Sequence, residues 1–496
     1  MAVWQALLCG ILYWLAEANV PYITIWTVQK PLVCGWLTGC IIGAPLEGAF
    51  CGALISLLYI GHKSQGSSMP ADIALAGICA AASCCAGVAA GVSVFYALPA
   101  GLFGILIWKL RLFMNARFMN RAEKAITKGQ TWAILVPAVL IPVLFSAAVC
   151  IPIGAIFSVV SFSSARMLIA SSLITILVAH GLALVGLVLC AAGLVLPLFP
   201  IREWRHATSF IIGVLSVLIL RVPLLWLALP AVLFSYIAAR AMEKALAASS
   251  NESADPDLVS GLAPDWDPDL DCDEAASKKS ADTLRSTPIP HSRQVLTACS
   301  LLWILFVQAA YNTKLMMGQA AAVAFVPVAK ALYPNDPELQ QQLLQRQCVY
   351  LNTQPELGSC LIGRLAAMEA QEDAPAQIRS VRSSLMGVFG ALGDELFQCG
   401  WIPLLLLLAS DLVLYGGHIG SSVLFYIGTA VISAALLSAV SFQAGFSHDE
   451  MQILDLLESG VFHRIRHTLD LLLPFFQGAA LGTLALQVVL PAVLAL

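Results

Sequence analysis

The polar side chains best placed to do chemistry lie in a short break between two apolar runs, residues 61–72. The break contains Gly, Ser and Pro and ends at the carboxylate of Asp72. Its other hydrogen-bonding side chains include His62, Lys63, Ser64 and Gln65. Backbone released from a helix at membrane depth is tolerated only where protein or a water-filled cavity receives it. Because such breaks commonly build substrate sites in transporters, we expect either a site of that kind or an ordinary loop outside the membrane.

A second polar stretch, Asn352-Thr353-Gln354-Pro355, closes a Gln-rich run in the second half of the chain. Its amides and hydroxyl could bind a polar ligand. The same residue types also form helix caps and turns, because Asn and Thr favour helix ends and Pro does not continue a helix. Farther along, Gly393-Asp394 places one acid at the edge of an apolar run. Both interpretations of the Asn352 stretch stay open at this point.

The elements that position these residues are predicted to be membrane helices. The chain has 496 residues, of which 59% are hydrophobic and 11% charged, and its mean hydropathy is +0.84. Apolar runs long enough to cross a hydrocarbon core recur at residues 131–160, 166–200 and 207–239. Residues 1–10 carry no basic region and no small-residue cleavage site, so no removable signal peptide is expected. The composition indicates an all-α polytopic integral membrane protein and excludes a soluble or nucleic-acid-binding function.

Charged residues gather in two places that indicate topology. A basic cluster contains a single acid, Glu123. Its basic residues are Lys109, Arg111, Arg117, Arg121, Lys124 and Lys128. By the positive-inside rule this segment is a cytoplasmic loop, an interpretation that we favour over nucleic-acid binding. Residues 246–294 are acidic, contain Ser and Pro, and have few large aliphatic side chains, which predicts a disordered cytoplasmic linker.

The sequence patterns do not indicate a metal or a cofactor. Most of the fourteen cysteines lie inside apolar runs, where Cys acts as a small hydrophobic residue. No CxxC pair faces a second CxxC or an HxxxH sequence, so we expect neither a zinc site nor a disulfide framework. No P-loop of the form GxxxxGK[ST] occurs, and ATP-driven transport therefore has no support.

Glycines recur every four or five residues within the apolar run at residues 31–61. They are Gly39, Gly43, Gly48 and Gly52. Small-residue stripes of this kind allow membrane helices to approach closely. We therefore expect tight helix packing in this run.

Taken in order along the chain, the motifs resemble two subunits of the mannose/fructose/sorbose family of the bacterial phosphotransferase system (PTS). Motifs similar to those of a IIC subunit are Lys30-Pro31-Leu32, the glycine-spaced run, Gly61, Gly66 and the stretch from Asp72 to Ala76. Motifs similar to those of a IID subunit are Val326-Pro327, Leu332-Tyr333-Pro334, Asn352-Thr353-Gln354-Pro355, Leu385-Met386-Gly387 and Gly393-Asp394.

The resemblance implies two helical halves that contain re-entrant or broken helices. Residues 1–245 would form a IIC-like membrane domain, and residues 295–496 a IID-like membrane domain. The acidic linker at 246–294 would join them. Within the second domain, the polar and helix-prone residues 334–382 would form a cytoplasmic helical layer.

The resemblance also implies a function. The chain would be a permease component that binds a sugar and translocates it as the sugar is phosphorylated. A phosphohistidine on a separate cytoplasmic IIB subunit, recharged through IIA, would supply the phosphoryl group, so whether this chain is itself an enzyme stays open. The family further implies a homotrimer, surrounded by lipid, in the bacterial cytoplasmic (inner) membrane. No residue identifies the sugar.

Site residues follow from the same resemblance. Asp72 is expected to be catalytic, because a bound sugar needs a carboxylate that takes its hydroxyl proton, and Asp394 is the second candidate. The residues expected to bind substrate are Thr27, Ser56, Ser64, Gln65, Asn312, Asn352, Gln354 and Asp394.

Several positions depart from the family pattern. Thr27, Ser56 and Ser64 stand where typical IIC subunits carry longer polar side chains, Lys314 replaces an acid, and Glu395 replaces a proline. Loss of a buried hydrogen bond costs about 1–3 kcal/mol, so an unaltered mannose preference is not expected. An alternative is a diverged facilitator or membrane sensor that no longer phosphorylates. His62-Lys63 could serve an acidic sugar or could be an interfacial basic pair.

Overall fold

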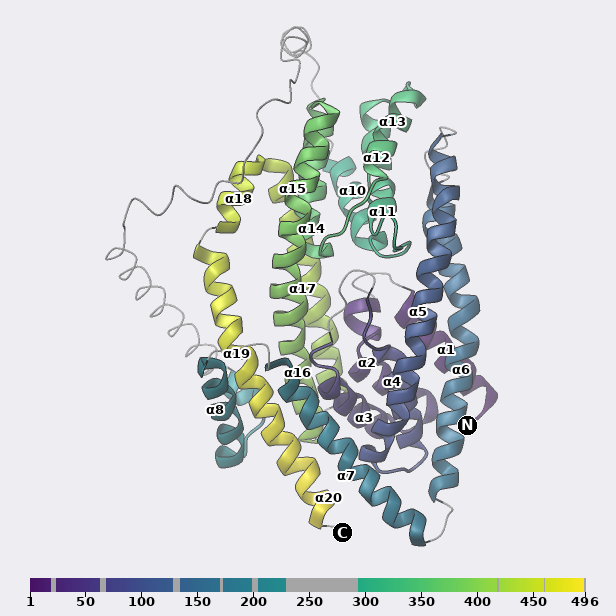
Figure 1. The fold of residues 1–496 in the computed structure, drawn as a ribbon, viewed down its shortest axis with the longest axis vertical. Helices are drawn as coiled ribbons and strands as arrows, with labels where there is room; N and C mark the ends of the chain where they lie inside the picture. The colour runs from purple at the N-terminus through teal and green to yellow at the C-terminus, as the bar shows by residue number, and fades with distance from the viewer. Residues whose placement is uncertain are drawn as a thin grey trace, which may run out of the picture.

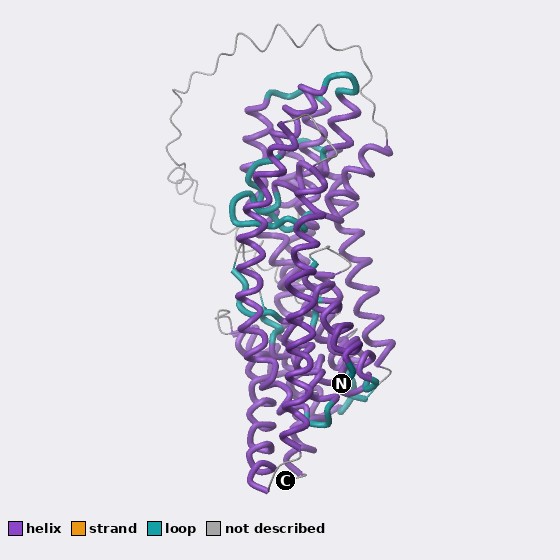
Figure 2. Tube along the Cα trace, turned by 90° about the vertical axis from the view of Figure 1, so that its right-hand side faces the viewer, coloured by secondary structure: helices purple, strands orange, loops and turns teal. Residues whose placement is uncertain are grey.

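The computed structural model describes residues 1–18, 24–62, 68–127, 134–169, 173–198, 204–228, 293–416, 419–458 and 460–494. Over these ranges the regular structure is helical (Figure 2). Six of the described helices are long and apolar enough to cross a membrane, and they cover Ala90–Ala122, Val136–Ile169, Val178–Leu198, Pro375–Leu414, Ile419–Ser447 and Arg464–Leu494. The predicted all-α, multi-pass membrane fold is confirmed. Residues 246–292 of the predicted linker, Ser64 and Gln65 lie outside the described residues, whereas residues 293 and 294 begin a helix.

The first half begins with short helices and continues with long ones (Figure 1). Its helices are α1 (Val3–Glu17), α2 (Pro31–Ile42), α3 (Pro45–Leu58), α4 (Ile73–Cys85), α5 (Ala90–Thr127), α6 (Ile141–Ile169), α7 (Leu173–Val195) and α8 (Trp204–Leu220). α2 and α3 have 12 and 14 residues, whereas a spanning helix needs about 20. The chain reverses between them at Gly43, whose φ of 100° lies in the left-handed region. This half therefore contains the broken helices that were expected.

Glycines bring the backbones of α2 and α3 into contact. A Cβ added at Gly35 would lie 2.7 Å from the carbonyl oxygen of Gly48, and one added at Gly39 would lie 3.0 Å from the Cα of Gly48. A Cβ at Gly52 would lie 2.5 Å from a backbone oxygen of α2. Larger side chains would force the two helices apart. The close packing predicted from the glycine spacing is confirmed, while Gly43 forms the turn instead.

The described part of the basic cluster lies on a helix, where the charge pattern alone predicts a loop, and Lys128 lies outside the described residues. α5 continues without interruption through Arg111, Arg117, Arg121 and Lys124 to Thr127. Arg111 is buried, and its guanidinium forms an ion pair with the carboxylate of Glu17 on α1. A basic residue that neutralises a buried acid carries no information about topology, so one member of this cluster is structural.

The described part of the second half contains eleven α-helices and two π-helical segments. The α-helices are α10 (Arg293–Phe306), α11 (Gly318–Ala324), α12 (Val326–Leu332), α13 (Pro337–Gln347), α14 (Pro355–Ala370), α15 (Pro375–Gly393), α16 (Ile402–Leu414), α17 (Ile419–Ser447), α18 (Glu450–Glu458), α19 (Gly460–Leu484) and α20 (Leu490–Leu494). A π-helical segment, Asp394–Trp401, joins α15 to α16 in one continuous helix. The helix-prone stretch 334–382 forms α13, α14 and the start of α15, and its cytoplasmic placement stays a prediction.

The two halves pack against each other along several helices. α8 lies beside α19 (Figure 1), where Gly213 and Gly478 allow close backbone approach. The hydroxyl of Ser209 donates to the carbonyl of Leu471 at 2.8 Å. At another contact, the amide of Asn115 on α5 donates to a carbonyl oxygen of the second half at 3.0 Å. These contacts hold the two halves together.

Candidate functional site

A cavity of about 720 Å³ lies at the junction of the two halves. We call it the junction cavity. Its polar and aromatic lining from the first half is Trp26, Gln29, Lys30, Ser56, Tyr59, His62 and Trp108. Its corresponding lining from the second half is Gln308, Tyr311, Asn352, Thr353, Gln354, Asp394, Glu395 and Gln398. A volume of this size with convergent polar groups is typical of a small-molecule site.

The wall from the first half is built by a short π-helical segment, Thr24–Val28, and by the start of α2. The indole nitrogen of Trp26 donates to the carboxylate of Glu356 on α14 at 2.5 Å. The hydroxyl of Tyr426 donates to the carbonyl of Trp26 at 2.9 Å. The ammonium of Lys30 lies 5.1 Å from the centre of the Trp26 ring. Trp26 is thus fixed to the second half while one side of it faces the cavity.

The wall from the second half contains the Asn352 stretch, which caps α14 and also lines the cavity. The side-chain oxygen of Gln354 accepts from the amide of Leu357 at 2.8 Å, and its nitrogen donates to the carboxylate of Glu356. The backbone amide of Asn352 contacts the sulfur of Met386 at 3.1 Å. The cap interpretation and the site interpretation of this stretch are therefore compatible, because its outer side faces the cavity.

Asp394 lies in the π-helical segment between α15 and α16 and lines the cavity. Glu395 and Gln398 of the same segment line it as well. Arg466 of α19 forms an ion pair with Glu395 at 2.9 Å. π-Helical turns are frequent at functional sites because the extra residue re-aims neighbouring side chains. The segment thus brings two carboxylates to one wall.

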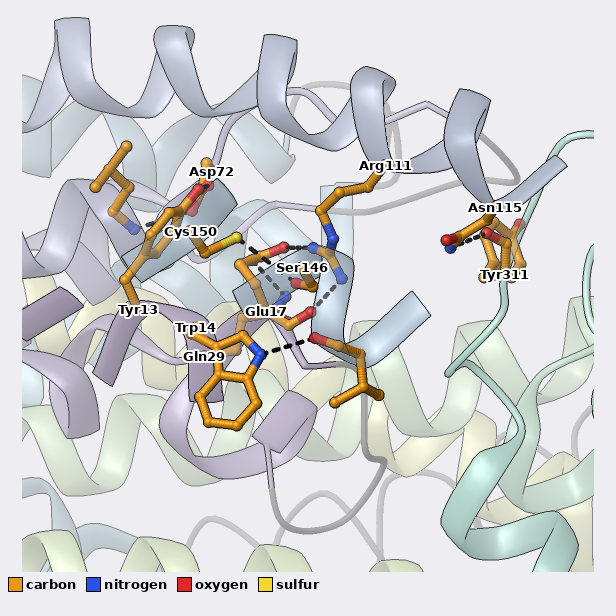
Figure 3. Close-up of polar contacts among 12 residues, drawn as sticks. Tyr13, Trp14, Glu17, Gln29, Asp72, Arg111, Asn115, Ser146, Cys150 and Tyr311 are labelled. Atoms are coloured by element: carbon orange, nitrogen blue, oxygen red, sulfur yellow. Dashed lines mark hydrogen bonds and ion pairs between the residues drawn. The ribbon is translucent and has the colours of Figure 1, made fainter. Parts of the chain in front are cut away.

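Asp72 lies in a closed polar cluster and is not among the residues that line the cavity. It caps α4, where its carboxylate accepts from the amide of Leu75 at 2.9 Å and from the hydroxyl of Tyr13 at 2.6 Å. Figure 3 shows the side chain of Tyr13 directed at Asp72. Only 1% of Asp72 is exposed. Direct contact with a sugar in the junction cavity would require the helices around Asp72 to move.

The ion pair of Glu17 and Arg111 lies beside this cluster (Figure 3). Besides the carboxylate, the guanidinium also donates to the carbonyl oxygen of Glu17. The amide of Gln29, which lines the cavity, donates to the carboxylate of Glu17 at 3.4 Å. Gln29 therefore connects the cavity wall to the buried ion pair.

The other predicted binding residues divide into two groups. Ser56 lines the cavity, and its hydroxyl accepts from the amide of Leu32 at 3.0 Å. Thr27 and Asn312 are buried but do not line the cavity. The amide oxygen of Asn312 accepts from the amides of Lys314 and Leu315, both at 3.0 Å, and so closes a turn.

Several lining residues were not predicted from the sequence. Trp26, Gln29, Trp108 and Tyr311 are examples. The signal available for Gln29 was its position with Lys30 between two apolar runs. The aromatic residues give no comparable signal, because aromatic side chains are common throughout apolar helices.

Two family models match the chain, one in each half. Residues 3–237 match the model described as PTS system sorbose-specific IIC component. Residues 292–491 match the model described as PTS system mannose/fructose/sorbose family IID component. Together these matches place a IIC domain and a IID domain in one polypeptide.

Curated relatives are similar to the second half. The PTS system mannose-specific EIID component of Escherichia coli K12 is 24% identical over 177 residues, which is 35% of this chain and 62% of that protein. The PTS system sorbose-specific EIID component of Klebsiella pneumoniae is 31% identical over 129 residues, 25% of this chain and 47% of that protein. The chain thus spans less than two thirds of the length of these relatives.

Among solved structures, the chain resembles one described as the mannose transporter ManYZ in complex with microcin E492. That match has 20% sequence identity and a TM-score of 0.29, and it covers 38% of this chain and 69% of the other. A score this low carries no argument about the site. On the two family models, this chain belongs to the mannose/fructose/sorbose family of the phosphotransferase system, as a IIC domain joined to a IID domain.

Proposed function

We propose that this chain binds a sugar in the junction cavity and carries it across the bacterial cytoplasmic membrane, coupled to phosphorylation of the sugar by a separate IIB subunit. The observation that carries this proposal is the position of the cavity. Amides and hydroxyls from both the IIC and the IID domain line it, and the IID domain adds two carboxylates. Relative movement of two domains around one site is how alternating access works.

Two carboxylates are the candidates for the general base that takes the proton of the sugar hydroxyl. The motif points to Asp72, whereas the cavity lining points to Asp394. A general base must come within hydrogen-bond reach of the proton that it removes. Because Asp72 is buried away from the cavity whereas Asp394 lines it, the geometry favours Asp394 for this step.

The proposed partners are cytoplasmic IIA and IIB subunits, and the proposed assembly is a homotrimer of the fused chain. Family membership supports both. The proposed division of the chain is a IIC domain at 1–245, a linker at 246–294 and a IID domain at 295–496, with a cytoplasmic layer at 334–382. Fusion in one polypeptide fixes the ratio of IIC to IID at one to one.

The test is phosphoenolpyruvate-dependent phosphorylation of sugars by membrane vesicles that contain this chain. Cognate IIA and IIB and the general PTS proteins are added, and mannose, fructose, sorbose, amino sugars and sugar acids are compared. We expect at least one phosphorylated product that depends on IIB. Absence of any product, together with sugar flux that needs no PTS protein, would overturn the proposal.

That second result would favour a facilitator or sensor that no longer phosphorylates. Two observations support keeping this alternative. Asp72 lies off the cavity lining, and the hydroxyl of Ser56 already accepts a hydrogen bond from Leu32. Sugar uptake in a strain without the soluble PTS proteins distinguishes the two functions, because only the facilitator would retain it.

A further inference from the structure

We propose that the junction cavity contains an oxyanion site built around Lys30, Thr353 and Trp108, which takes either the carboxylate of an acidic sugar or the phosphoryl group of a sugar phosphate. This inference rests on the proposed function and specifies the chemistry of its site. All three residues line the cavity. Each offers a hydrogen-bond donor that no described residue occupies.

Lys30 supplies the positive charge. Its side chain is partly buried at the start of α2, and its contact with a described residue is the face of the Trp26 ring, 5.1 Å from the ammonium nitrogen. Within the described ranges, no carboxylate forms an ion pair with it. A cation withdrawn from water without a counter-ion is costly, so such a group favours an anionic ligand.

Thr353 and Trp108 supply neutral donors. The hydroxyl oxygen of Thr353 and the indole nitrogen of Trp108 are both buried, and neither has a hydrogen-bond partner in the described part of the chain. Only 5% of Thr353 is exposed. Buried polar atoms are nearly always paired, and one that lines a cavity without a protein partner can bond a ligand atom or water. An indole N–H only donates, which suits an oxyanion.

The helices add a favourable field. α2 and α14 both begin at the cavity, which Pro31 and Pro355 line at their first turns. The positive end of the helix dipole therefore faces the cavity from each half. Their first amides are already occupied, by Ser56 in α2 and by Gln354 in α14. Side chains, not backbone amides, would therefore make the direct contacts to the anion.

The carboxylates on and near the cavity lining do not cancel this site. Glu395 is paired with Arg466 at 2.9 Å. Glu356 receives hydrogen bonds from Trp26 and Gln354. Asp394 has partners of its own. Glu395 and Glu356 are therefore already paired with groups other than Lys30.

The experiment measures anion binding to the purified full-length chain in nanodiscs of zwitterionic lipid, by isothermal titration calorimetry. The probes are inorganic phosphate, gluconate, mannose 6-phosphate and neutral mannose. We expect Lys30→Gln to weaken anion binding at least about tenfold, as loss of a charge-assisted hydrogen bond does. Lys30→Arg should retain most of the affinity, and Thr353→Val should weaken it severalfold.

Lys109 provides the matched control, because it is exposed on α5 next to Trp108. Lys109→Gln should leave anion binding unchanged. Should Lys30→Gln fail to fold, Thr353→Val alone decides the outcome. The proposal is overturned if the parent chain binds none of the anions, if the Lys30 and Thr353 variants bind them as the parent does, or if Lys30→Gln weakens neutral mannose equally.

The two sources of the anion give different patterns. Lys30-dependent binding of gluconate without binding of phosphate or mannose 6-phosphate identifies a substrate carboxylate. Lys30-dependent binding of phosphate or mannose 6-phosphate identifies the transferred phosphoryl group. The measurement needs neither IIA nor IIB, so its failure is separable from a failure of phosphorylation in vesicles.

Discussion

α4 and α14 are capped at their first turns in the same way, but only the cap of α14 lines the junction cavity. In each, a polar side chain caps the helix by accepting from the amide three residues later: Asp72 from Leu75 at 2.9 Å, and Gln354 from Leu357 at 2.8 Å. The remaining oxygen of Asp72 is taken by Tyr13 in a closed cluster. Gln354 faces the junction cavity.

This difference teaches that a cap motif does not identify a binding site. Both caps satisfy orphan amides of a first helical turn, which any buried helix start requires. Only the cap whose outer side stays uncovered by other helices can also meet a ligand. Substitutions at the closed cap, Asp72, and at the open cap, Gln354, can therefore be compared with each other.

The largest expected effect is on the rate of phosphorylation, when the general base that takes the proton of the sugar hydroxyl is removed. Asp394→Asn should lower the rate of sugar phosphorylation by about a hundredfold or more, the usual contribution of a general base. Asp72→Asn should cost less, because Asn can still cap α4. Initial rates in vesicles, normalised to the amount of inserted chain, measure both. If the Asp72 variant were inactive and the Asp394 variant active, the assignment would be reversed in favour of the residue that the motif indicates.

The next effect concerns the ion pair beside the closed cap. Arg111→Met should lower the free energy of unfolding by about 3–5 kcal/mol, because it leaves the buried Glu17 carboxylate without its partner. Thermal unfolding in detergent measures the loss. Arg117→Met, an exposed position on the same helix, is the control. Adding Glu17→Gln to Arg111→Met should recover stability, and no recovery would contradict the ion-pair explanation.

A matched pair of substitutions distinguishes the open cap, Gln354, from an ordinary helix cap, Asp336. Gln354→Ala should cost about 1 kcal/mol of stability through the lost cap and should also weaken sugar binding. Asp336 caps α13 by accepting from Glu338 and Leu339, both at 3.0 Å, and is exposed. Asp336→Ala should cause a similar loss of stability and leave the sugar dissociation constant unchanged. Equal effects on binding would remove the distinction between the two caps.

The smallest expected effect is on stability at Thr353. Thr353→Val removes a buried hydroxyl without a partner among the described residues, so the free energy of unfolding should stay within about 1 kcal/mol of the parent or rise. Ser359, whose hydroxyl donates to the carbonyl of Pro355 at 3.1 Å, gives the comparison. Ser359→Ala should destabilise more than Thr353→Val in the same thermal assay, and the reverse order would indicate an unrecognised partner for Thr353.

Much of the fold could be predicted from the sequence. Apolar run length predicts helices that cross a membrane, and the glycine spacing between Gly39 and Gly52 predicts the close pairing of α2 with α3. The charge pattern was less reliable, because Arg111 belongs to a buried ion pair on α5. Charge counts report topology only for side chains that stay in water.

The candidate site could be predicted in part. Ser56, Asn352, Gln354 and Asp394 line the junction cavity, and the order of motifs was enough to identify them as candidates. Thr27 and Asn312 have the same polar character but are buried away from it. Polarity in an apolar segment indicates that a group needs a partner, and it does not say whether protein or ligand provides that partner.

The sequence by itself determined the class of the molecule, its helical halves and the family to which they belong, because these depend on hydropathy, spacing and motif order along the chain. Only the tertiary structure decided which of the polar helix starts line the junction cavity between the two halves. Trp26 meets Glu356 across 330 positions of sequence, and Tyr13 covers Asp72 across 59. Such contacts depend on how whole helices pack, a property that no local pattern of residues encodes.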